Sequence, residues 1–280
     1  MQRLAPRIEE WAVYRALVAE LAEQPGVTVE SVEILADQDP TIEFDKPMVV
    51  LINRFSASAS EIVAAALQDY GRAIVVGGEF SHGKGTVQLV VDLDNYVAPM
   101  AKAYSPLGAL KITIQKFFRV NGGSTQYKGV TPDIILPDPY AHLESGEQFL
   151  KHSIPWAKVK AVPFTPWKAS FNKKKVMTES QTRVKKNPRF QRIQETVTWY
   201  DQRRKLTIKD LTMDGFLKDR KEVKERSEAL EKEEESKALT VKSMDSLKEK
   251  VAQEKFEEYT KTMRVDPVIE ESMLIIKDML

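Results

Sequence analysis

The chain has 280 residues, of which 42% are hydrophobic and 30% are charged, and its formal net charge at pH 7 is +1. This length and apolar content allow a buried core and favour two domains. The balanced charge gives no sign of a nucleic acid or a membrane surface as a partner. The chain has no cysteine, which excludes disulfides, thiolate catalysis and cysteine metal sites. Residues 1–10 lack the apolar centre of a signal peptide, and no stretch has the length of a transmembrane helix.

The first eighty residues predict alternating helices and strands. Apolar residues at helical spacing predict an amphipathic helix over residues 8–24, and a strand-like alternation follows over residues 27–35. Two apolar runs at residues 48–52 and 73–77 predict buried strands, with a helix over residues 58–70 between them. In such a β-α-β unit the two strands are parallel, so the sequence predicts an α/β core.

Further strands are expected before residue 140. The patterns over residues 87–93 and 109–118 favour strands, joined by a loop over residues 95–106. Residues 129–137 predict a short edge strand, because prolines bracket it and proline cannot donate a hydrogen bond to a sheet.

The character of the chain changes near residue 140. Prolines and tryptophans over residues 140–186 predict a linker lying against the core. Residues 187–280 are helix-prone and highly charged, which predicts a helical domain whose charged faces are solvated. Sparse apolar positions in this part leave room for a bundle or for a groove that faces a partner.

A serine-rich turn leads from the strand at residues 48–52 into the following helix. Ser58 and Glu61 fit a capping box, which is the more common meaning of such a pair. A hydroxyl at this turn also lies at the mouth of a sheet, beside free N–H groups and the positive end of the helix dipole, where an oxyanion is stabilised.

Lys84 lies between two glycines after the second apolar run, which is an unusual place for a merely solvated lysine. A neutral lysine can activate a serine, and serine–lysine pairs are a known variant of the catalytic triad. Gln88 could orient the lysine amine through its side-chain carbonyl. The backbone N–H groups of Ala59 and of a neighbouring glycine would polarise the scissile carbonyl.

Several motifs resemble the catalytic core of the tail-specific proteases, also called C-terminal processing peptidases. They are Phe55–Ile62, Gln68–Ala73, Gly83–Gln88, Ser105–Thr113 and Asn121–Asp133. The similarity runs from about residue 34 to residue 137, and the charged helical tail looks like the C-terminal domain of the longer bacterial members. The resemblance implies a partial crotonase/ClpP-like β-α-β spiral core, followed by a mostly α-helical C-terminal domain.

The resemblance also implies roles for the site residues. It assigns the nucleophile to Ser58, with Ser60 as the next candidate and Ser56 as the last. It makes Lys84 the general base and Gln88 its orienting residue.

Ala59 supplies a backbone donor to the oxyanion in the same scheme. His82 is an alternative base, against which the resemblance and the lack of a partner acid argue. His142 and His152 have no companions at metal-ligand spacing, and we expect neither a metal nor another cofactor.

The implied function is a serine endopeptidase with a Ser–Lys dyad that degrades or processes proteins from their C-terminal tails. The expected partners are unfolded or tagged protein substrates and an adaptor on the helical domain, with no nucleic acid and no integral membrane segment. The resemblance implies a periplasmic location. One alternative is a catalytically silent fragment whose helical domain binds a partner. A weaker one is a crotonase-like acyl-CoA enzyme, against which the Ser–Lys pair argues.

The chain also departs from the family pattern. Family members carry a long helical region, a PDZ domain and an oxyanion-hole glycine before the serine, and residues 1–32 resemble none of these. We therefore expect a fragment, a mispredicted gene start or a truncated paralogue. The expected division is a divergent helical segment (1–32), a partial protease core (33–139), a linker (140–186) and a charged helical domain (187–280).

Overall fold

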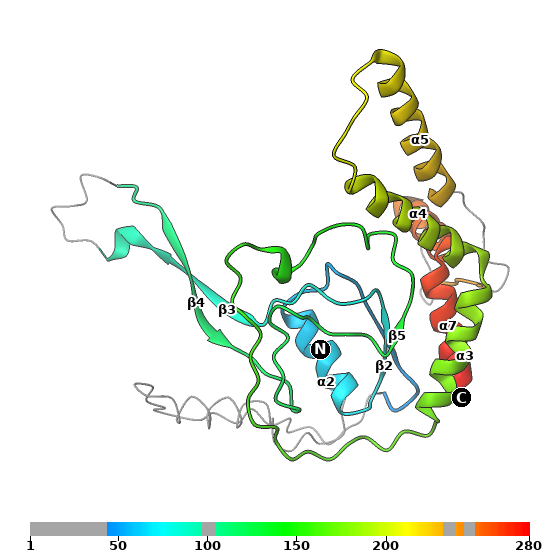
Figure 1. Ribbon diagram of the computed structural model, residues 1–280. Helices are drawn as coiled ribbons and strands as arrows, with labels where there is room; N and C mark the ends of the chain where they lie inside the picture. The colour runs from blue at the N-terminus through cyan, green and yellow to red at the C-terminus, as the bar shows by residue number, and fades with distance from the viewer. Residues whose placement is uncertain (1–43, 97–104, 232–238, 244–249) are drawn as a thin grey trace.

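A three-stranded parallel sheet lies at the centre of the computed structural model (Figure 1). The structure describes residues 44–96, 105–231, 239–243 and 250–280. The sheet has the order β1 (Val49–Ile52), β2 (Ile74–Gly77) and β5 (Ile134–Ile135). Both pairings are parallel, which confirms the predicted β-α-β unit and the edge strand. The elements predicted over residues 8–24 and 27–35 lie outside the described residues.

Helix α2 (Ala59–Asp69) connects β1 to β2, as the sequence predicts. The helix ends in a Schellman motif, in which the N–H of Gly71 bonds the carbonyl of Gln68 and the N–H of Arg72 bonds that of Leu67. Gly71 adopts a φ of +67°, which a glycine reaches without steric cost.

The same end of α2 is tied to a distant loop by charge. The guanidinium of Arg119 forms two hydrogen bonds with the Asp69 carboxylate, at 2.7 and 2.8 Å, and a third with the side chain of Gln68. Helix α2 therefore ends in a fixed position.

The two faces of the sheet carry separate apolar clusters. Val75 points toward α2, where it packs with Ile52, Ala64 and Ala65. Its neighbours in β2 point the other way, as the two-residue period of a strand requires. They join a core with residues of the C-terminal helices, and this cluster contains Ile74, Val76, Ile134, Leu136, Val176, Phe190, Ile275 and Met279. Figure 1 accordingly shows three layers, with α2 on one face of the sheet and the C-terminal helices on the other.

The C-terminal half is helical and charged, as predicted for residues 187–280. Its helices are α3 (Lys173–Lys186), α4 (Pro188–Arg204), α5 (Met213–Glu231), α6 (Lys250–Val265) and α7 (Pro267–Met279). Asparagine or aspartate caps the starts of α3, α4 and α7, with proline as the first residue of α4 and α7. Helix α3 falls within the segment 140–186, where the sequence predicts a linker and no helix, and it packs against α7.

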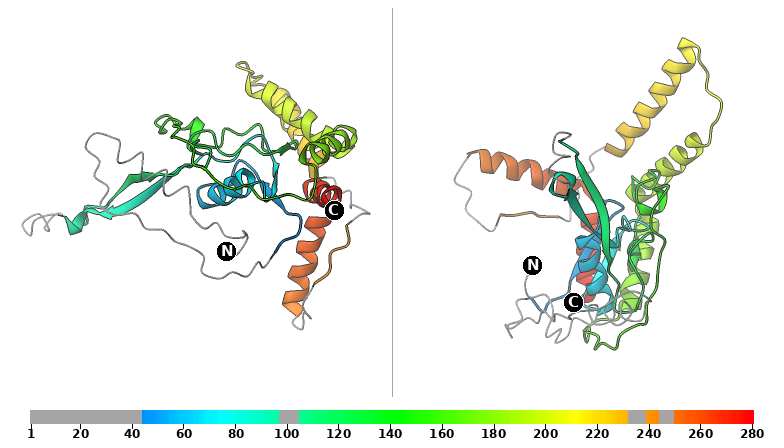
Figure 2. Two further views of the ribbon diagram at one scale, coloured as in Figure 1. Left: turned by 90° about the horizontal axis from the view of Figure 1, so that it is seen from below. Right: turned by 90° about the vertical axis from the view of Figure 1, so that its left-hand side faces the viewer.

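A two-stranded antiparallel ribbon projects from the core (Figure 2). It consists of β3 (Thr86–Asp92) and β4 (Ala109–Lys116), which confirms both predicted strands. The register shifts between Val87 and Gln88. Short 3-10 turns occupy Leu93–Asn95 and Glu147–Phe149.

The α/β core and the mostly α-helical C-terminal part agree with the predicted fold class. None of the described helices is both long and apolar enough to cross a membrane.

Candidate active site

The turn between β1 and α2 holds the predicted nucleophile in an unusual backbone conformation. Ser58 has φ 57° and ψ −116°, whereas a residue with a side chain rarely adopts a positive φ. Such a conformation costs about 1–3 kcal/mol and persists only where the surrounding structure enforces it. Sharp, strained turns from a strand into a helix are the places where some hydrolases expose a nucleophilic serine.

The Glu61 side chain explains what holds this turn. Ser58 is the N-cap of α2, and the Glu61 carboxylate accepts the Ser58 N–H at 2.8 Å, as the predicted capping box requires. The carboxylate is completely buried and accepts three more hydrogen bonds, from the Ser81 hydroxyl (2.5 Å), the Gly83 N–H (2.7 Å) and the Lys84 N–H (2.8 Å). The segment that carries Lys84 is therefore held against the segment that carries Ser58.

Close backbone packing fixes the other side of the Lys84 loop. A Cβ on Gly83 would lie 2.8 Å from the Tyr127 carbonyl oxygen, and one on Gly85 would lie 2.3 Å from the Gln126 nitrogen, so neither position has room for a side chain. The Gly85 N–H donates to the side-chain oxygen of Gln126 at 2.8 Å, and Gln126 is itself buried. The two glycines that flank Lys84 thus let the loop approach its neighbour closely.

Two further contacts place this loop within the core. Ser81 donates its hydroxyl proton to Glu61 and accepts the N–H of Val130 at 2.7 Å. The N–H of His82 donates to the Ser56 carbonyl at 2.9 Å, which ties the loop directly to the serine-rich turn.

A buried arginine anchors the start of the same turn. Arg54 is 2% exposed, and its guanidinium pairs with Asp138 at 3.3 Å and donates to the Leu143 carbonyl. It also lies over the ring of Phe80. The turn is therefore attached to the chain that follows β5 as well as to the Lys84 loop.

The structure brings some of the predicted site residues together. Ser58 and Lys84 lie on segments joined through Glu61. Ala59 is the first residue of α2, where backbone N–H groups have no acceptor within the helix. Gln88 lies in β3 of the projecting ribbon with an exposed side chain, and its orienting role stays a prediction.

The competing candidates have different surroundings. The Ser56 hydroxyl accepts the N–H of Asn53 at 3.1 Å, and Ser60 is an exposed residue in the first turn of α2. The ring of His82 is half-buried, and its backbone carbonyl accepts the N–H of Glu147.

Sequence reasoning missed four side chains that build this site. Three of them are Arg54, Ser81 and Gln126. The fourth is Glu61, which was predicted only as a helix cap and not as the acceptor for Ser81, Gly83 and Lys84. Buried polar residues at 0–2% exposure are informative once a structure is available, but on a single sequence they resemble ordinary surface residues.

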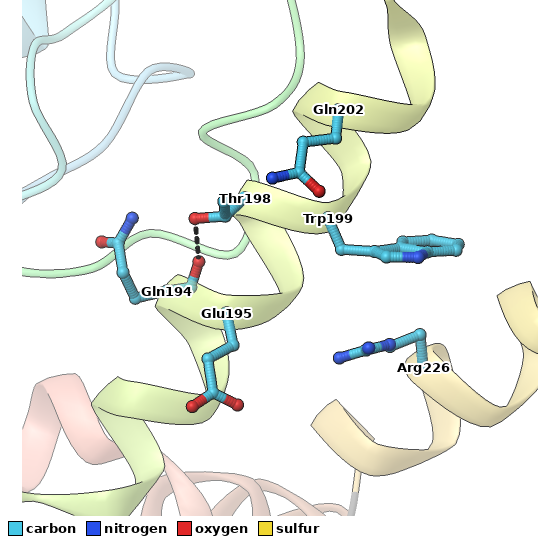
Figure 3. A pocket seen from close by; sticks show the side chains of 6 residues that line it. All are labelled: Gln194, Glu195, Thr198, Trp199, Gln202 and Arg226. Carbon is cyan, nitrogen blue, oxygen red and sulfur yellow. Dashed lines mark hydrogen bonds between the residues drawn. The ribbon is translucent and has the colours of Figure 1, made fainter. Parts of the chain in front are cut away.

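A separate hollow of about 400 Å³ lies between α4 and α5 (Figure 3). Trp199 and Arg226 line it side by side, with the guanidinium 5.6 Å from the ring centre. The hollow contains none of the predicted catalytic residues. Within the part of the chain that the structure describes, no cluster of three or more metal-ligating side chains occurs.

Comparison with known proteins agrees with this architecture. Residues 15–136 match the model of peptidase family S41, and residues 140–280 match that of the C-terminal domain of tail-specific protease. The chain therefore belongs to the class of proteins in which an α/β core of peptidase family S41 is followed by a helical domain. The second match alone covers half of the sequence, and the chain belongs to the tail-specific protease family, which confirms the family predicted from the motifs.

The individual relatives are much longer than the matched region. The chain is 44% identical over 135 residues to the tail-specific protease of Haemophilus influenzae, an alignment that covers 48% of this chain and 19% of that protein. It is 44% identical over 95 residues to the carboxy-terminal-processing protease of Bartonella bacilliformis, covering 34% of this chain and 19% of that protein. The chain thus spans about a fifth of the length of these curated relatives.

A solved structure is also similar in part. The photosystem II D1 C-terminal processing protease is 34% identical, with a TM-score of 0.30 over 37% of this chain and 24% of that one.

Proposed function

We propose that this chain carries the catalytic centre of a serine endopeptidase, with Ser58 as the nucleophile and Lys84 as the general base. The observation that carries the proposal is the positive φ of Ser58 at the start of α2, with the Lys84 loop held beside it. Neither Ser56 nor Ser60 has a positive φ. Residues held in such rare conformations cluster at active sites, where the strain serves the mechanism.

The proposed reaction is acyl transfer through an ester on Ser58. The Ser58 oxygen attacks the carbonyl carbon of a peptide bond while Lys84 takes the hydroxyl proton. The N–H of Ala59 stabilises the oxyanion, and Gln88 orients the lysine amine. The C–N bond then breaks as Lys84 returns the proton to the leaving amine. Water, deprotonated by Lys84, hydrolyses the ester and frees Ser58.

The proposed substrates are unfolded or tagged proteins, which the enzyme degrades or trims from their C-terminal tails in the periplasm. The names of the relatives, tail-specific and carboxy-terminal-processing protease, support this substrate class. Because the chain spans about a fifth of those relatives, their activity and substrates enter here only as part of the proposal.

Proteolysis of casein by the purified chain in the presence of a metal chelator tests the proposal. We expect cleavage that the chelator does not inhibit and that is lost in Ser58→Ala and in Lys84→Ala. His82→Ala and Ser60→Ala are the matched controls and should retain cleavage. Unchanged cleavage in Ser58→Ala would show that the nucleophile is wrongly assigned.

A second candidate function is a catalytically silent interaction fragment whose helical part binds a partner or adaptor. The observation that favours it is a set of exposed apolar side chains around the connection between α4 and α5. They are Leu206, Ile208, Leu211, Met213 and Phe216, with exposed fractions of 51–94%. Grouped exposed apolar residues often mark interaction sites. Partner capture that survives Ser58→Ala, together with no turnover of any unfolded substrate, would favour this candidate.

A further inference from the structure

The Glu61 carboxylate joins the two halves of the proposed catalytic centre. A glutamate that only caps a helix needs one hydrogen bond, to the N–H of the N-cap residue, and Glu61 has that bond with Ser58. Its three other donors belong to Ser81, Gly83 and Lys84, which follow it by 20 to 23 residues. Helix capping does not require these contacts, so they call for another explanation.

We propose that Glu61 is a positioning residue, which sets the distance and orientation between the Ser58 nucleophile and the Lys84 base. This inference rests on the proposed function. Glu61 does not itself touch the reacting atoms in this scheme. It acts through the backbones of the two residues that do.

One oxygen atom carries the link. The Oε2 atom of Glu61 accepts both the Ser58 N–H and the Lys84 N–H, each at 2.8 Å. If either segment moves, a buried carboxylate loses a hydrogen bond that water cannot replace. The other oxygen, Oε1, accepts the Ser81 hydroxyl and the Gly83 N–H, which prevents the carboxylate from rotating away.

The strain at Ser58 fits the same role. Its positive φ is unfavourable, and it needs contacts that over-determine the turn. The bond from the Ser58 N–H to Glu61 is such a contact, and it is anchored from the far side by the Lys84 loop. The nucleophile and the base therefore depend on one buried side chain for their relative placement.

Glu61→Gln is the test variant, because the amide has the same shape as the carboxylate but only one acceptor oxygen. Its NH₂ group cannot accept the hydrogen bonds that the second carboxylate oxygen accepts. Glu271→Gln is the matched control. Glu271 is also a buried glutamate, but it lies in α7 and pairs with Arg183. Within the loop, the Gly85 N–H is an internal control, since Gln126 and not Glu61 holds it.

Two measurements on the whole chain separate positioning from mere folding. The first is amide hydrogen exchange, which we expect to be faster in Glu61→Gln at Ser58, Gly83 and Lys84 but unchanged at Gly85. The second is the rate at which a fluorophosphonate probe labels Ser58. Small misplacements of reacting groups cost on the order of 100-fold in rate, and we expect a fall of that order in labelling and in kcat for a peptide, with KM unchanged. Glu271→Gln should leave all of these values at the wild-type level.

The outcomes distinguish the inference from the function on which it rests. Suppose that the probe labels the wild-type chain at Ser58, and that Glu61→Gln shows the same labelling rate and the same amide exchange. This result would overturn the positioning role of Glu61 and leave the proposed function standing. An unlabelled wild-type chain would overturn both. If circular dichroism shows that Glu61→Gln is unfolded, Glu61→Asp replaces it. That variant keeps the charge but is one methylene too short to bridge the two segments, and wild-type exchange and labelling in it would also refute the inference.

Discussion

The polar contacts around α2 differ sharply from those between α4 and α5. Around α2, polar side chains such as Glu61 and Gln126 are at most 1% exposed, and each meets several partners from distant parts of the chain. Between α4 and α5, Arg203 pairs with Asp219 and Trp199 donates to Glu222, and these side chains are partly buried or exposed.

Burial decides what these contacts can do. A buried hydrogen bond cannot be exchanged for one with water, so the network around α2 fixes the geometry of the backbone segments that it joins. An ion pair that water reaches is screened and easily replaced, so the partly exposed Arg203–Asp219 pair contributes less to a single geometry. Three predictions test this contrast, and one more tests the apolar core on the other face of the sheet.

The largest effect is expected at Arg54. Arg54→Ala leaves the largely buried Asp138 carboxylate without its cation, and removing one partner of a buried pair costs about 3–5 kcal/mol. Urea unfolding of the purified chain measures the loss. The control is Arg204→Ala, whose pair with Glu144 is at least half exposed on both sides and should change stability by less than about 1 kcal/mol. Equal losses of unfolding free energy in Arg54→Ala and Arg204→Ala would contradict the difference between buried and exposed pairs.

The next effect concerns the core shared by the sheet and the helices. Ile275 of α7 is fully buried in the cluster that contains Ile74 and Val76, so Ile275→Ala should cost about 2–5 kcal/mol. The neighbouring Met273 is 52% exposed, and Met273→Ala serves as the control with little expected change. A single unfolding transition that shifts as a whole would show that the sheet and α7 unfold together. Unchanged stability in Ile275→Ala would contradict the shared core.

A smaller loss is expected at Ser81. Ser81→Ala removes one donor from Glu61 and leaves the buried N–H of Val130 without its hydroxyl acceptor, at a cost of about 1–3 kcal/mol. Thermal unfolding followed by circular dichroism measures the loss. Ser81→Thr keeps the hydroxyl and is the control. A Ser81→Ala chain as stable as wild type would mean that this network does not hold the Lys84 loop.

The smallest effect is a pH dependence at the partly exposed pair of Arg203 and Asp219. Hydrogen bonding to the Arg203 guanidinium holds the pKa of Asp219 below its ordinary value of 3.8. The pair therefore adds stability above pH 3.8, and this contribution disappears as the pH falls through the lowered folded-state pKa.

Tryptophan fluorescence can follow this change, because Trp199 lies against Arg203. We expect the difference between wild type and Asp219→Asn to be present near neutral pH, to shrink in acid and to be weaker at high salt. Identical pH profiles of the two chains would rule out the coupling.

The sequence predicted most helices and strands well, because the patterns that indicate them lie within short stretches of the chain. The apolar runs before and after α2 predicted β1 and β2, and the helix predicted over residues 58–70 lies between them. The alternation over residues 109–118 likewise predicted β4.

Helix α3 was not predicted as a helix, because its sequence carries little apolar signal. It begins with three lysines, and its buried residues are Val176 and Ser180. Its place is decided by packing: Val176 enters the core under β2, while Arg183 pairs with Glu271 and Asp278 of α7. Neither interaction is visible in the local sequence.

The sequence by itself determined the family, the α/β class and the serine-rich turn with its candidate nucleophile, since motifs and periodicity lie within short stretches of chain. Only the tertiary structure decided that the Lys84 loop lies against the Ser58 turn. The contacts that join them, through Glu61, come from residues more than twenty positions apart, and no local pattern records which distant donors a buried carboxylate will meet.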